Sequence, residues 1–90
     1  MDIFKFFRKK REGNVYACVA GDYVGQMFMY ITKNDSCYGF LTIPNMESSW
    51  IVKDVFDSGI KDGIVEYVER TPKNVRDICK VQFQENGKNL

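Results

Sequence analysis

The longest run of strand-favouring residues in this chain is Val24-Gly25-Gln26-Met27-Phe28-Met29-Tyr30-Ile31-Thr32. Successive side chains of a strand point to opposite faces of a sheet. Met27, Met29 and Ile31 therefore share one face, and Phe28, Tyr30 and Thr32 share the other. Because both faces are largely apolar, we expect this strand to lie centrally, with both faces covered or with one face waiting for a partner.

The segments on either side of this run alternate in the same way and predict a three-stranded antiparallel meander. Residues 14–20 form the first predicted strand, and residues 37–43 form the third. Gly21-Asp22 and Lys33-Asn34-Asp35-Ser36 supply polar turn residues between the strands. Pro44 ends the third strand, since proline has no N–H to donate to a neighbouring strand.

The period of the pattern changes at residues 49–57, which we predict to be a helix. Its apolar side recurs at helical spacing and consists of Ile51, Val52, Val55 and Phe56. Trp50 falls on the polar side of this predicted helix, so we expect it to be partly exposed. Exposed tryptophan is enriched at binding hot spots. The alternative is that Trp50 covers the rim of its own core.

Two further strands are predicted after this helix, at residues 64–70 and 79–84. In the second, Cys79, Val81 and Phe83 point inward. The chain is thus predicted to be a single small α+β domain over residues 1–90, with an N-terminal helix, the meander, a second helix and two further strands on one twisted five-stranded sheet. A partly closed small barrel is the variant. Residues 14–84 are the sheet domain, and residues 85–90 are expected to form a polar tail.

The N-terminal segment combines apolar and basic residues. Residues 1–12 carry five basic and two acidic side chains, a net charge of +3, whereas the whole chain carries +1. Apolar residues at helical spacing, with Asp2 as cap and Gly13 after the end, predict a basic amphipathic helix over residues 1–12. The candidate basic patch on this helix consists of Lys5, Arg8, Lys9, Lys10 and Arg11.

The composition argues against several kinds of chemistry. The chain has no histidine, the commonest general base and metal ligand. Its three cysteines are widely spaced and odd in number, which predicts free thiols in the cytoplasm. A disulfide between Cys18 and Cys37, on neighbouring strands, is the alternative. We expect no enzyme activity, no catalytic, metal or cofactor site and no small-molecule substrate.

These patterns favour a small non-enzymatic regulatory or inhibitory domain that binds another protein, or itself as a homodimer, through an apolar sheet face. The candidate interaction residues are Met27, Phe28, Met29, Tyr30 and Trp50. The second hypothesis is a nucleic-acid-binding module that uses the basic patch, which steep loss of binding with salt would distinguish. Peripheral membrane contact through the apolar residues of the N-terminal helix, Ile3, Phe4, Phe6 and Phe7, is a third hypothesis.

Overall fold

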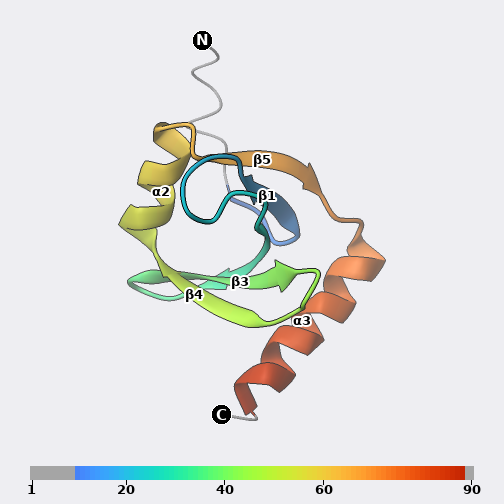
Figure 1. Ribbon diagram of the computed structural model, residues 1–90. Helices are drawn as coiled ribbons and strands as arrows, with labels where there is room; N and C mark the ends of the chain where they lie inside the picture. Colours follow the sequence, from blue (N-terminus) through green and yellow to red (C-terminus); the bar gives the residue numbers. More distant parts are fainter. Residues whose placement is uncertain (1–9, 89–90) are drawn as a thin grey trace.

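The computed structural model describes residues 10–88 and shows a curved antiparallel sheet of five strands with one helix on each side (Figure 1). The strand order in the sheet is β4-β3-β2-β1-β5. The elements in chain order are β1 (Asn14–Cys18), β2 (Met27–Lys33), β3 (Cys37–Ile43), β4 (Ser48–Val52), α2 (Lys53–Lys61), β5 (Val65–Arg70) and α3 (Lys73–Lys88). The predicted α+β class with a five-stranded antiparallel sheet is confirmed.

Strands β1, β2 and β3 form the predicted meander. Neighbours pair with Val15 opposite Met29 and Met29 opposite Leu41, so these side chains share one face. Strand β2 begins at Met27 rather than at Val24, because Gly25 has a φ of +92°, which lies outside the strand region. The central place expected for β2 is therefore observed.

Helix α2 joins the two edge strands, β4 and β5, and the sheet curves around it (Figure 1). Aromatic side chains fill the space between α2 and the sheet. Their rings meet edge to face, for example Tyr16 on Phe56 with centroids 5.0 Å apart. The buried members of this aromatic cluster are Tyr16, Tyr30, Tyr38, Phe40 and Phe56.

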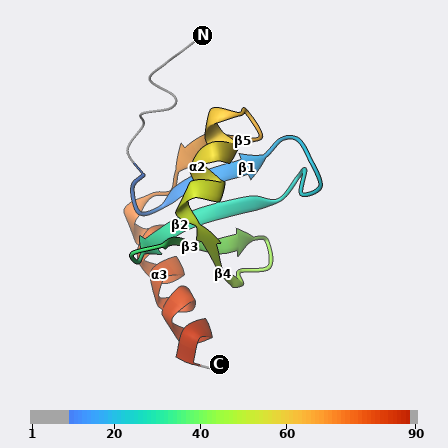
Figure 2. The ribbon, with the colours of Figure 1, turned by 90° about the vertical axis from the view of Figure 1, so that its left-hand side faces the viewer.

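Helix α3 packs on the opposite face of the sheet, so α2 and α3 lie on different sides (Figure 2). Its inward side chains are Cys79 and Phe83, which are buried. They pack with aliphatic residues from the other faces of the central strands, namely Val15, Met29, Ile31 and Leu41. Both faces of β2 are thus covered by the chain's own helices.

The helix predicted for residues 1–12 is not observed in the part that can be tested. Residues 1–9 lie outside the described residues. Residues 10–12 are not helical and lead through a turn at Gly13 into β1. Gly13 has a φ of +91°, in the left-handed region predicted for the residue after the helix, but it precedes a strand and does not end a helix.

The second half of the fold differs from the prediction in three places. Residues 48–52 are strand β4, and the helix α2 starts only at Lys53, so Trp50 lies on a strand. The strand predicted at residues 79–84 is wrong, because this segment belongs to α3. The polar tail predicted at 85–90 is wrong for residues 85–88, which complete α3, while residues 89–90 lie outside the described residues.

All three cysteines are free, as predicted. Cys18 lies on β1 and Cys37 on β3, and β2 runs between these strands. Strands two positions apart in a sheet are separated by about 10 Å, too far for a disulfide. The alternative of a Cys18–Cys37 bridge between neighbouring strands is therefore wrong.

Candidate functional site: the outer edge of β4

Strand β4 has one open side. It pairs with β3, and within residues 10–88 no strand lies along its other side. Two hydrogen bonds fix which residues face β3: Thr42 N–H donates to Glu47 O, and Lys53 N–H donates to Ser36 O. Because antiparallel pairs alternate between bonded and non-bonded, Ser49 and Ile51 also bond to β3. The backbone N–H and C=O groups of Ser48 and Trp50 and the N–H of Val52 consequently point outward, whereas the C=O of Val52, the N-cap of α2, accepts the first hydrogen bond of the helix. We call Ser48, Trp50 and Val52 the β4 edge.

The side chains of the β4 edge lie on the α3 face of the sheet. The Trp50 ring packs against Phe83 of α3, with centroids 5.5 Å apart. It also lies over Gly39, where a Cβ atom would be 3.1 Å from Trp50 Cζ3. Ser48 Oγ donates to Phe83 O at 3.2 Å. One face of the indole is thus fixed by its own core, while 49% of Trp50 and 50% of Val52 are exposed.

The two edge strands of the sheet differ in charge. Strand β5 carries Glu66, Glu69 and Arg70, and Arg70 Nε donates to Glu12 O at 3.0 Å. Strand β4 has the sequence Ser-Ser-Trp-Ile-Val, with no charge, proline or glycine. Charged residues are a common protection of edge strands against pairing with another chain. The β4 edge lacks this protection and is the candidate interaction site.

The other candidate residues of the sheet are placed inside the fold. Met29 and Tyr30 are buried, on opposite faces of the sheet, and Met27 and Phe28 are partly buried against the same two core clusters. Helices α2 and α3 cover these faces, so neither is open to a partner at β2. Of the candidate interaction residues, Trp50 alone combines high exposure with a place at an open edge.

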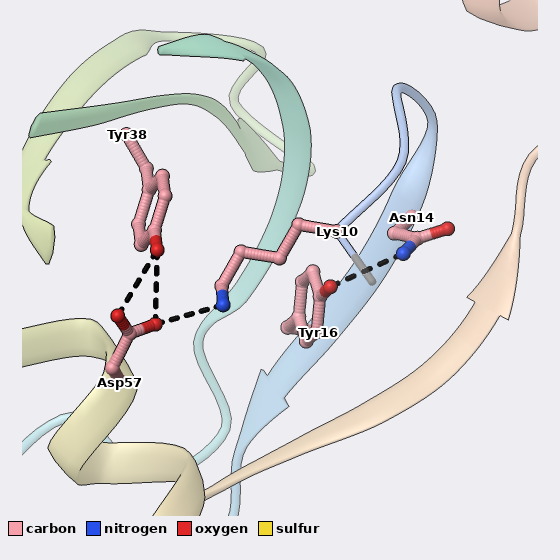
Figure 3. Close-up of polar contacts among 5 residues, drawn as sticks. All are labelled: Lys10, Asn14, Tyr16, Tyr38 and Asp57. Carbon is pink, nitrogen blue, oxygen red and sulfur yellow. Dashed lines mark hydrogen bonds and ion pairs between the residues drawn. The ribbon is translucent and has the colours of Figure 1, made fainter. Parts of the chain in front are cut away.

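A polar cluster lies where the aromatic cluster meets solvent, and Figure 3 shows its geometry. Asp57 of α2 accepts hydrogen bonds from the Tyr38 hydroxyl at 3.0 and 3.1 Å. Lys10 Nζ lies 2.7 Å from Asp57 Oδ1 and 4.8 Å from the centroid of the Tyr38 ring. Beside it, Asn14 Nδ2 donates to the Tyr16 hydroxyl at 3.1 Å. We call Lys10, Tyr38 and Asp57 the Asp57 cluster.

The Asp57 cluster changes the interpretation of the basic patch. The charge of Lys10 is directed to Asp57 and to an aromatic ring, so it holds the chain at residue 10 against α2. Arg11 is exposed. Lys5, Arg8 and Lys9 lie outside the described residues, as do the apolar residues proposed for membrane contact. Among the described residues the basic patch is therefore reduced to Arg11.

The Asp57 cluster predicts a dependence of stability on alkaline pH. Burial and the hydrogen bond to Asp57 raise the pKa of Tyr38 from 10.0 to about 12. The folded state therefore favours the protonated phenol. This stabilisation is complete below pH 10, the unfolded value, and is lost as the pH rises through the folded pKa of about 12.

We expect Tyr38→Phe to flatten the decline of the unfolding free energy between about pH 10 and 12, and to cost about 0.5–1.5 kcal/mol at neutral pH. Urea unfolding at a series of pH values measures both effects. Tyr23→Phe is the matched control, because Tyr23 is 74% exposed. An equal decline of the unfolding free energy at alkaline pH in the wild type and in Tyr38→Phe would contradict the assignment of this pH dependence to Tyr38.

Sequence reasoning selected Trp50 but not its neighbours Ser48 and Val52. A signal was present, since the run Ser48–Val52 is rich in β-branched and aromatic residues, which favour strands.

No described helix is long and apolar enough to cross a membrane. Residues 10–88 contain no group of three metal-ligating side chains. Comparisons of the chain with models of protein families, with curated proteins and with solved structures find no match.

Proposed function

We propose that the protein is a small non-enzymatic interaction domain that binds a protein partner by strand addition at the β4 edge. The observation that supports it is the combination of outward-directed backbone groups at Ser48, Trp50 and Val52 with a half-exposed tryptophan. In strand addition the backbone supplies affinity, and alternate side chains supply specificity. A regulatory or inhibitory role fits such a domain, and three free cysteines fit a cytoplasmic setting.

The edge replaces the sheet face as the proposed site for a physical reason. A sheet face can bind a partner only if its apolar side chains are accessible, and those of β2 are covered by α2 and α3. Trp50 is a suitable anchor because Phe83 and Gly39 already hold its ring, so little side-chain freedom is lost on binding.

A variant that blocks the β4 edge without harming the fold can test this proposal. Val52 has a φ of −56° and a ψ of 132°, values that proline adopts without strain. Its N–H points outward, so Val52→Pro removes a donor from the edge and none from the sheet. We expect Val52→Pro to keep the wild-type thermal midpoint within a few degrees.

Selection of peptides from a random display library provides the binding test. We expect wild-type protein to select extended apolar peptides that bind Val52→Pro at least roughly tenfold more weakly. The same peptides should bind Glu69→Lys normally, since Glu69 lies on the opposite edge strand. A selection that yields no peptide sensitive to Val52→Pro would contradict strand addition at this edge.

A further inference from the structure

The β4 edge is complementary to itself, and we propose that its partner is a second copy of this chain. In the complex two β4 strands pair antiparallel about a two-fold axis at Trp50, and the two sheets become one continuous sheet. This inference rests on the proposed strand addition and adds the identity of the added strand.

The backbone groups support this register. The three residues with outward-directed groups are evenly spaced about Trp50, at positions 48, 50 and 52. A two-fold axis at Trp50 places Ser48 opposite Val52 of the partner subunit and Trp50 opposite its own copy. Trp50 then exchanges two hydrogen bonds with its copy, and each Val52 N–H donates to the Ser48 C=O opposite it, which gives about four backbone hydrogen bonds between the subunits. An axis at Ser49 or Ile51 would leave one of the three without an opposite residue on β4.

The charges that flank β4 support the same register. Glu47 directly precedes the strand, and Lys53 directly follows it. With the axis at Trp50, Glu47 lies opposite Lys53 of the partner subunit, and symmetry repeats this pair at the other end. With the axis at Ser49, Glu47 would face Ile51 of the partner subunit, and with the axis at Ile51 it would face Val55 of the partner subunit. Opposite charges at facing positions stabilise a strand pair.

Exposed apolar surface is covered in this arrangement. Trp50 and Val52 are each about half exposed in the single chain and lie on the same face of the sheet. Across the two-fold axis the two indoles become neighbours, each already supported by its own Phe83. Since α2 and α3 lie on the faces of the sheet, the side of β4 that points away from β3 is left for the second strand (Figures 1 and 2).

Exchange of the flanking charges tests the inference. Glu47→Lys alone places two lysines together at each end of the strand pair, and Lys53→Glu alone places two glutamates together. We expect each variant alone to dimerise roughly tenfold more weakly than the wild type. An equimolar mixture restores both opposite-charge pairs, and we expect it to form a heterodimer with an affinity close to that of the wild type. Sedimentation equilibrium over a range of concentrations measures the dimer affinity of each variant and of the mixture.

Two further variants complete the test. Val52→Pro should weaken the dimer at least roughly tenfold. Glu69→Lys, which changes the net charge as Glu47→Lys does but lies on β5, should leave it unchanged. Trp50 is the only tryptophan in the chain, so its emission should shift to shorter wavelength as the wild type associates.

The outcomes separate the two proposals. A wild type that stays monomeric at all concentrations overturns self-pairing. If the display library nevertheless yields peptides sensitive to Val52→Pro, strand addition stands with a foreign partner; if it does not, both proposals fail. A dimer that is indifferent to Val52→Pro and to the charge exchange uses another surface and overturns the inference.

Discussion

Replacement of Phe40 by alanine is expected to lower the free energy of unfolding by about 3–5 kcal/mol, a large part of the stability of a domain of this size. Phe40 is fully buried at the centre of the aromatic cluster. Its ring lies 4.8 Å from that of Phe56 and 5.9 Å from that of Tyr30. Removal of the ring leaves a cavity that closes only if α2 and β3 move closer together.

Chemical denaturation of Phe40→Ala with circular dichroism gives this free energy. Tyr23→Ala is the control: Tyr23 is equally aromatic but largely exposed, so its loss should stay within about 0.5 kcal/mol. A loss below about 1 kcal/mol for Phe40→Ala would mean that the aromatic cluster does not hold α2 on the sheet.

Replacement of Gly39 by valine is expected to cost about 1–3 kcal/mol through overpacking. A Cβ atom at this position would lie 2.9 Å from Phe83 Cζ and 3.1 Å from Trp50 Cζ3. Both rings must then shift, and with them the anchor of the β4 edge. We therefore expect the emission of Trp50 to change together with stability.

A double-mutant cycle distinguishes this clash from a general effect of valine. Phe83→Leu removes the Cζ atom that meets the new Cβ, so Gly39→Val should cost less in that background than in the wild type. Costs that simply add would show that the contact among Gly39, Phe83 and Trp50 does not determine the effect.

The meander could be predicted from sequence because its signals are local. Residues 14–43 alternate with period two, and each pair of strands is separated by turn residues with a physical preference for reversal. The structure adds the loop before Met27, where Gly25 at positive φ delays the start of β2. Local patterns were sufficient here since each of these strands is covered on both faces.

The prediction for the second half of the chain was wrong for reasons that individual residues explain. Strand β4 runs directly into α2, so Ile51 and Val52 joined Val55 on one helical wheel although they belong to a strand. In α3 the inward positions include Arg76, whose aliphatic stem packs against Gly13. Because Arg76 is charged, it interrupted the apolar pattern of helical period that would have predicted α3. The alternation of Cys79, Val81 and Phe83 then led to the prediction of a strand, although Val81 is exposed.

The candidate site was only partly accessible to sequence reasoning. Trp50 could be selected by residue type, since tryptophan is rare and frequent in interfaces. Which backbone groups remain unpaired depends on the order of strands in the sheet, and that order is a property of the whole chain. The basic patch illustrates the converse, because Lys10 meets Asp57, which is remote in sequence.

Amide hydrogen exchange along β4, measured by nuclear magnetic resonance at low and high protein concentration, tests the self-pairing of β4 most directly. Ser49 and Ile51 bond to β3 and should be protected at both concentrations. Trp50 and Val52 should exchange quickly when dilute and become protected when concentrated, to a degree comparable to that of Ser49 and Ile51. Protection that does not alternate along β4 in dilute solution, or that is independent of concentration at Trp50, would contradict pairing of this edge with its copy.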